Sequence, residues 1–296
     1  MRIFGLVIAT VLALFGCGEP TGDTTKSETP PPAPPKLWET RPPIPPLKPF
    51  ETHGRIDHDG ASIWYASYGA GAPVLLLHGA LGNAENFGNQ VPALVKTGHR
   101  VILIDSRGQG RSTRDARPFT YELMESDVVA VMSALKINRA AIVGWSDGGI
   151  IGLIMAMKHP KRVTRVFAFG ANMDPTGVMP NLDQRPIFLG LIEQAAKDYA
   201  RLSSTPNDFQ TLAEAIFKMI AYQPNYTAKD LAAIKGPRIA IVDGEHEEAV
   251  QPEHTKYLAR TIPGAKLIIL PGVSHWAPIQ KPDEFNKAML AFLDAP

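Results

Sequence analysis

The chain has 296 residues, 45% of them hydrophobic, and is long enough to bury the core of one or two domains. Its 30 basic and 29 acidic residues leave a net charge of +1 with no basic stripe, which argues against a nucleic-acid-binding protein. A single cysteine excludes intrachain disulfides, so the fold depends on its core.

Residues 1–17 have the pattern of an export signal. Arg2 precedes an apolar run over residues 3–15, which is too short to span a bilayer comfortably and fits a secretory signal. Cys17 follows directly, and Leu14-Phe15-Gly16-Cys17 resembles the lipobox of bacterial lipoproteins, although Phe15 stands where a small residue is usual. We therefore expect a membrane-anchored lipoprotein facing the periplasm or cell exterior. A cleaved signal, giving a secreted or periplasmic protein, is the alternative.

Residues 18–50 hold 11 of the 27 prolines, with Gly, Ser, Thr and Glu between them. Such a segment cannot form helix or sheet ladders, so we expect a disordered, extended tether. If Cys17 is acylated, the tether would hold the folded domain away from a membrane; the alternative is a leader without a role. The folded domain is expected over residues 51–296.

From residue 51 onward, strand patterns alternate with helix patterns. Two short strands flank Asp59-Gly60 and predict a hairpin. The predicted strands cover 55–58, 62–66, 74–77, 101–104, 141–143, 166–169, 239–242 and 267–270, and the predicted helices cover 84–96, 121–136, 147–158, 253–262 and 283–293. Short apolar strands between helices predict an α/β fold with a mostly parallel, doubly wound sheet.

Between residues 169 and 239 the alternation lapses. Amphipathic helices are predicted over 186–201 and 208–221, with no strand signal between them. We expect an insertion over about 172–236 that forms a small helical cap above the carboxyl edge of the sheet. Its large apolar residues indicate an apolar cleft or the core of the cap itself; they are Met173, Met179, Phe188, Met219 and Tyr222.

The motif Gly144-Trp145-Ser146-Asp147-Gly148 lies between a predicted strand and a predicted helix. G-x-S-x-G in this context is typical of a nucleophile elbow, a sharp turn that lifts the serine hydroxyl clear of the sheet. Small residues at 144 and 148 are needed because the two backbones crowd each other. We predict that Ser146 is a nucleophile; the alternative is a Gly-rich turn whose serine caps the helix.

A serine nucleophile needs a base, and the base needs a carboxylate. Of the eight histidines, His275 follows the last strand in a carboxyl-edge loop, where such a sheet collects its chemistry. Residues 243–248 hold four acids, and spacing alone does not choose among them. His246 and His254 lie near acids, but their spacing fits no compact ligand pattern, so we expect no metal and no cofactor.

The developing oxyanion needs two preorganised donors. The backbone N–H of Asp147, next to the nucleophile, is one candidate. The other is the N–H of Ala80 in the loop His78-Gly79-Ala80-Leu81-Gly82. A tight turn without a catalytic donor is the alternative, and His78 is expected to support this loop.

Together these motifs resemble the α/β-hydrolase superfamily over residues 55–294. The matching segments are 78–82, 105–112, 144–148, 244–247 and 274–275, and 105–112 looks like a structural turn of this family. The family usually has G-x-x-D after the seventh strand. That register places Glu247 in the acid position, with Asp243 and then Asp174 as alternatives.

The elbow is similar to that of small-ester hydrolases of the valacyclovir-hydrolase and enol-lactonase type. This resemblance implies a carboxylesterase that cleaves a small or medium ester through an acyl-enzyme on Ser146, with Trp145 and Leu81 lining the pocket. The alternative for Trp145 is that it packs only against a neighbouring strand. The alternatives are lactone, carbon–carbon or amide cleavage or perhydrolysis by the same triad, or a non-catalytic surface binding protein.

Overall fold

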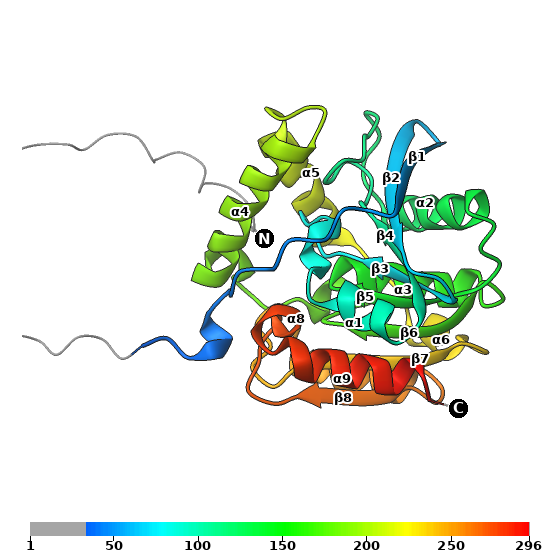
Figure 1. The fold of residues 1–296 in the computed structure, drawn as a ribbon. Coiled ribbons are helices and arrows are strands. Elements are labelled where there is room, and N and C mark those ends of the chain that lie inside the picture. Colours follow the sequence, from blue (N-terminus) through cyan, green and yellow to red (C-terminus); the bar gives the residue numbers. More distant parts are fainter. Residues whose placement is uncertain (1–33, 296) are drawn as a thin grey trace, which may run out of the picture.

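The structure is a computed structural model that describes residues 34–295 (Figure 1). The predicted signal over 1–17, with Cys17, and the first part of the predicted tether lie outside the described residues. Within 34–295, no helix has the length and apolar composition needed to cross a bilayer.

An eight-stranded sheet forms the centre of the molecule, in the order β1-β2-β4-β3-β5-β6-β7-β8. Its strands are β1 (Thr52–His58), β2 (Ala61–Tyr68), β3 (Ala72–Leu77), β4 (His99–Ile104), β5 (Ala140–Trp145), β6 (Val163–Phe169), β7 (Arg238–Gly244) and β8 (Lys266–Leu270). The β1–β2 hairpin and the β2–β4 pair are antiparallel, and all other pairs are parallel. The predicted α/β-hydrolase fold is confirmed.

Helices cover both faces of this sheet (Figure 1). One core packs α2 (Tyr121–Ala134), α3 (Asp147–Lys158) and α7 (Pro252–Thr261) on the sheet, and the other packs α1 (Gln90–Lys96) and α9 (Pro282–Leu293). Side chains alternate along each strand: Leu75 and Leu77 enter the first core, and Val74 and Leu76 enter the second. Because both faces of the central strands β3 to β6 are buried, the carboxyl halves of these strands are apolar, whereas β1 is polar and largely exposed.

The prediction of a single helix over 84–96 is wrong. The segment forms two helices, η2 (Ala84–Phe87) and α1, and Gly88 lies in the break between them. The N-terminal segment passes so close to this point that a Cβ on Gly88 would lie 1.9 Å from the Pro45 carbonyl oxygen. The break therefore allows the N-terminal segment to approach the backbone at Gly88, a tertiary contact that cannot be predicted from helical periodicity.

The prediction of a disordered tether over 18–50 is corrected for residues 34–50, which lie against the folded domain (Figure 1). They begin with a short helix, η1 (Leu37–Glu39), which contacts α8 (Ala277–Gln280). The Gln280 amide donates to the Thr40 carbonyl oxygen at 2.9 Å. Farther along, Ile44, Leu47 and Phe50 pack on the second core. Proline removes hydrogen bonds from helix and sheet ladders, but it does not prevent apolar side chains from packing.

The predicted cap helices are present between β6 and β7, as α4 (Pro186–Leu202) and α5 (Phe209–Tyr222), followed by α6 (Ala228–Ala232). Ion pairs join this cap to the core: Arg201 to Glu85 at 2.6 Å and Arg114 to Asp208 at 2.7 Å. The cap therefore covers the carboxyl end of the sheet.

Candidate active site

Ser146 lies at the junction of β5 and α3 in a strained conformation, with φ 55° and ψ −117°. Non-glycine residues seldom adopt positive φ, and such strain concentrates at functional sites. The turn closes because its neighbours are glycines. A Cβ on Gly144 would lie 2.2 Å from the Gly148 carbonyl oxygen, and one on Gly148 would lie 1.9 Å from that of Leu77. The serine side chain is thereby held at the edge of the sheet, half-buried.

The loop that follows β3 passes directly against Ser146. A Cβ on Gly79 would lie 3.0 Å from the Ser146 Cβ, and the next residue is Ala80. Asp147 is the first residue of α3, so its N–H has no acceptor within the helix. The two predicted oxyanion donors therefore belong to backbone segments on either side of the serine.

His78 supports this loop through hydrogen bonds at both ring nitrogens. The Ser106 N–H donates to His78 Nε2 at 2.9 Å, so the proton is on Nδ1, which donates to the Gly79 carbonyl oxygen at 2.8 Å. Burial lowers the pKa of His78, with the Asp105 charge and the Gly79 bond opposing, which is consistent with a neutral ring. Both ring nitrogens are thus used in positioning, and His78 is not free to act as a base.

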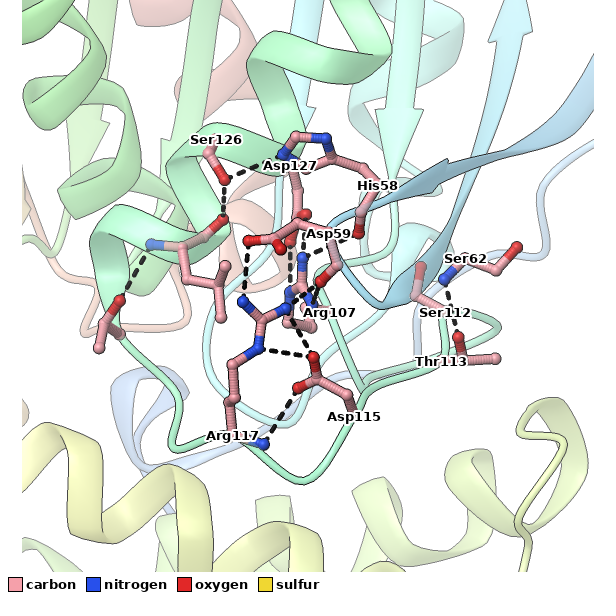
Figure 2. Close-up of polar contacts among 12 residues, drawn as sticks. His58, Asp59, Ser62, Arg107, Ser112, Thr113, Asp115, Arg117, Ser126 and Asp127 are labelled. Carbon is pink, nitrogen blue, oxygen red and sulfur yellow. Dashed lines mark hydrogen bonds and ion pairs between the residues drawn. The ribbon is translucent and has the colours of Figure 1, made fainter.

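The turn over 105–112 braces the same loop. The buried Asp105 carboxylate accepts from the Ala84 N–H at 2.6 Å and from the Arg111 N–H at 2.8 Å. Arg107, almost fully buried, donates to both carboxylate oxygens of Asp127 and to the Asp59 carbonyl oxygen (Figure 2). The turn is thereby fixed between α2 and the β1–β2 hairpin, the structural role that the resemblance implies.

The structure brings Glu247 into contact with His275. His275 Nδ1 lies 2.8 Å from Glu247 Oε1, and both side chains are buried. Glu247 Oε1 also accepts from the Ala249 N–H at 2.7 Å and the Val250 N–H at 3.1 Å. The His275 ring lies over Gly170, just beyond β6, because a Cβ there would be 2.5 Å from its Cε1. Since β6 pairs with β5, the histidine lies beside the strand that leads into Ser146.

The other acids near this loop have different partners. Asp174 lies 3.6 Å from His254 Nδ1, and Glu245 accepts from the Gly272 N–H at 2.8 Å. Asp243 accepts from the Thr255 hydroxyl at 2.6 Å, and Glu248 accepts weakly from the His275 backbone N–H at 3.4 Å. Among these acids, only Glu247 forms a hydrogen bond with the His275 ring.

Burial governs the titration of this pair. It raises the pKa of Glu247 to about 7, with the Glu248 charge adding and hydrogen bonds from Asp243 and two backbone N–H groups opposing. Burial also lowers the pKa of His275, against the charges of Glu248, Asp243 and Asp147. A neutral His275 with its Nδ1–H directed at a carboxylate can accept a proton at Nε2.

The two predicted pocket residues have different positions. Leu81 lines a small gap of about 10 Å³ between the Ala80 loop and the cap helices, which is large enough for a water molecule and too small for a substrate. Trp145 is buried in the second core and makes a T-shaped contact with Trp276, with the ring centroids 5.5 Å apart. Trp145 therefore packs against the residue that follows His275, and its place in the substrate pocket stays a prediction.

Two contacts of the site could not be predicted from a local motif, although Phe188 belongs to the apolar cap residues that were expected to line a cleft or form the core of the cap. Phe188 on α4 lies 6.1 Å from His275 between ring centroids, and places the cap over the histidine. The buried Tyr121 hydroxyl donates to Asp147 Oδ1 at 2.8 Å. Burial raises the pKa of Asp147 to about 6, with the Tyr121 hydrogen bond and His275 opposing. These contacts join distant segments, so no local motif reports them.

Comparison with known proteins agrees with this geometry. Residues 72–207 match the family model described as alpha/beta hydrolase fold. The human protein "Serine hydrolase BPHL" is 30% identical over 257 residues, which cover 82% of this chain and 86% of that protein.

Solved structures show the same similarity. Est816, described as an N-acyl homoserine lactone degrading enzyme, is 28% identical with a TM-score of 0.66, over 81% of this chain and 100% of its own. The enol-lactonase from Burkholderia xenovorans LB400 superposes with a TM-score of 0.65 at 24% identity, over 81% of this chain and 99% of its own. At that identity the enol-lactonase supports the fold alone.

Proposed function

Because this chain belongs to the α/β-hydrolase superfamily, we propose that it is a serine hydrolase that cleaves a small or medium carboxylic ester through an acyl-enzyme on Ser146. The observation that carries this proposal is the buried contact between His275 Nδ1 and Glu247 Oε1, 2.8 Å long, beside the strained elbow at Ser146. A carboxylate, an imidazole and a serine at one sheet edge are the parts that acyl transfer requires.

In the proposed mechanism, Ser146 Oγ attacks the ester carbonyl while its proton moves to His275 Nε2. Glu247 keeps the other ring proton on Nδ1 and stabilises the imidazolium. The backbone N–H groups of Ala80 and Asp147 stabilise the oxyanion. Its collapse expels the alcohol, which takes the proton from His275. Water then attacks the acyl-enzyme by the same steps, releasing the carboxylic acid and restoring Ser146.

A lactone is the second candidate substrate, and the similarity to Est816 favours it. A lactone is a cyclic ester, so the bond broken and the residues used are the same. The difference is that the alcohol remains attached to the acyl group after ring opening. Comparison of open-chain esters with lactones of equal carbon number distinguishes the two.

The test is hydrolysis of p-nitrophenyl acetate, butyrate and octanoate by the full chain. We expect Ser146→Ala and His275→Ala each to lower kcat by about 10³-fold or more, since the three groups act as a unit. Ser133→Ala, an exposed serine on α2, is the matched control and should react like the wild type. A folded protein that a serine-directed phosphonate does not label would instead be a non-catalytic binding protein.

We also propose that the protein is exported and anchored through a lipid on Cys17, on the sequence pattern of residues 1–17. The test is incorporation of radioactive palmitate in a bacterial host. Label that disappears in Cys17→Ser supports the anchor. Export without label would indicate an ordinary cleaved signal.

A further inference from the structure

Glu247 shares its surroundings with a second buried acid. Asp243, on β7, is 2% exposed and Glu247 is 7% exposed. Their carboxyl groups lie within hydrogen-bonding reach of each other. Two carboxylates this close cannot both be ionised without a large repulsive cost, so the pair holds a proton. The site therefore depends on which of the two carries it.

The contacts of Glu247 favour its ionised form. Oε1 accepts from His275 Nδ1 and from the Ala249 and Val250 N–H groups. Oε2 is buried, and no donor among the described residues reaches it while both acids are ionised. A buried carboxylate oxygen left without a donor costs about 1–3 kcal/mol or more. A proton supplied by the neighbouring acid would remove this cost.

Burial and the neighbouring Glu247 favour the neutral form of Asp243, whereas the Thr255 hydrogen bond and the His275 charge oppose it. The Thr255 hydroxyl donates to Oδ2 at 2.6 Å and leaves the other oxygen to carry a proton, with only the adjacent Gly244 N–H near it at 3.1 Å. The charged groups that face Asp243 are Glu247 and, beyond it, His275. Burial, together with the Glu247 charge, raises the pKa of Asp243 well above its ordinary range.

We propose that Asp243 is a protonated positioning residue whose carboxyl group donates a hydrogen bond to Glu247 Oε2, which fixes Oε1 on His275. The proposal rests on the proposed function, because it assigns how the acid of that triad is held. Glutamate has one more rotatable bond than the aspartate more usual here, and a second anchor on its free oxygen restricts that freedom. Asp243 thus acts through Glu247 and does not touch the substrate.

The test compares two substitutions of Asp243 in the full chain. In Asp243→Asn the amide N–H donates to Glu247 Oε2 and the amide oxygen still accepts from Thr255, so kcat should stay within about threefold of wild type, less than 1 kcal/mol. Asp243→Leu keeps the branching at Cγ, is larger than aspartate and has no donor. It should lower kcat on the order of 10- to 100-fold with little change in KM, as when an orienting partner is lost.

A spectroscopic measurement separates positioning from a general structural effect. The downfield proton resonance of His275 Nδ1–H should be retained in Asp243→Asn and should move upfield in Asp243→Leu. If Asp243→Leu does not fold, Asp243→Ala provides the same comparison.

The proposal is overturned if Asp243→Asn loses as much activity as Glu247→Gln, since Asp243 would then act ionised. That result does not contradict the proposed serine hydrolase function as long as Ser146→Ala is inactive. Conversely, an active Ser146→Ala contradicts the proposed function, while the His275 resonance still decides whether Asp243 donates to Glu247.

Discussion

Ser146 depends on its glycine neighbours as much as on its own side chain. At Gly148 the helix backbone touches β3, and any Cβ would overlap the Leu77 carbonyl oxygen at 1.9 Å. We expect Gly148→Ala to lower the free energy of unfolding by about 2–4 kcal/mol, because backbone must shift to admit it. Urea unfolding measures this loss.

Gly190 is the matched control for this substitution. It lies within α4, where the nearest atom that a Cβ would meet is the end of the Arg41 side chain at 4.0 Å. Gly190→Ala should therefore stabilise the protein by about 0.5–1 kcal/mol. Equal effects at the two sites would contradict the close approach at the elbow.

The carboxylate of Glu247 determines the acidic limit of activity. With a pKa raised to about 7 by burial, Glu247 becomes protonated as the pH falls through that value. A protonated Glu247 no longer holds the proton on His275 Nδ1, so kcat/KM should fall about tenfold per pH unit well below 7. A pH–rate profile that stays flat down to about pH 5 would contradict the raised pKa of Glu247.

The same shift makes stability depend on pH with the opposite sign. Because the folded-state pKa of Glu247 lies above its ordinary value of 4.5, the folded protein binds this proton more tightly than the unfolded chain does. The stabilisation is complete below 4.5 and is lost as the pH rises through about 7. Relative to wild type, Glu247→Gln should therefore gain more in Tm at about pH 8 than at about pH 5, as calorimetry can measure. A constant difference would contradict the raised pKa.

At the scale of residues, motifs predicted Ser146 and His275, and the family resemblance selected Glu247 among four acids; the structure brings Glu247 against His275, and the catalytic roles of all three stay predictions. The elbow is local in sequence, and the other two follow strands that must end at the same sheet edge. The proton on Asp243 and the contact between Tyr121 and Asp147 could not be predicted, because each depends on side chains from elements far apart in sequence.

The N-terminal segment is the element that sequence reasoning placed least well. η1 and the residues after it contact both loops of the candidate triad. Trp38 stacks on His246 with ring centroids 3.9 Å apart, and the Arg41 guanidinium lies 4.4 Å from the centre of the Trp276 ring. Gln280, which donates to Thr40, also accepts the Ser274 N–H at 2.8 Å. This segment therefore connects the acid loop and the base loop.

We expect Trp38→Ala in the full chain to lower the free energy of unfolding by about 1 kcal/mol, because the stacked pair with His246 is lost. Its exposed neighbour Leu37 is the control, and Leu37→Ala should be close to neutral. Denaturant unfolding of both variants measures the difference. Equal stability would indicate that the segment does not hold the acid loop.

The central strands were predictable from sequence because burial on both faces gives each of them a continuous apolar run. The break at Gly88, the short helix α8 and the docking of residues 34–50 were not. Each depends on a contact between segments that are distant in the chain, and such contacts cannot be predicted from composition or periodicity.

At the scale of the whole molecule, the candidate site lies between the sheet and the cap, so the cap should set the size of the acyl group. Phe188 on α4 contacts both His275 and Trp276. Removing this ring enlarges the space above the histidine, and each additional buried methylene of a substrate contributes about 0.8 kcal/mol. In Phe188→Ala we expect the optimum among p-nitrophenyl esters to move toward longer acyl chains.

The measurement is kcat/KM across the acetate, butyrate and octanoate series. Tyr222, on α5 and 66% exposed, is the control, and Tyr222→Ala should leave the optimum unchanged. An unchanged optimum in Phe188→Ala would show that α4 does not border the acyl group.

The central claim is that Ser146 carries the acyl group during turnover. The most direct measurement is the mass of the intact protein after rapid acid quenching of a reaction with p-nitrophenyl butyrate, followed by peptide mapping. We predict a butyryl adduct on Ser146 in the wild type and none in Ser146→Ala. Turnover by Ser146→Ala at the wild-type rate, or an adduct on another residue, would contradict the claim.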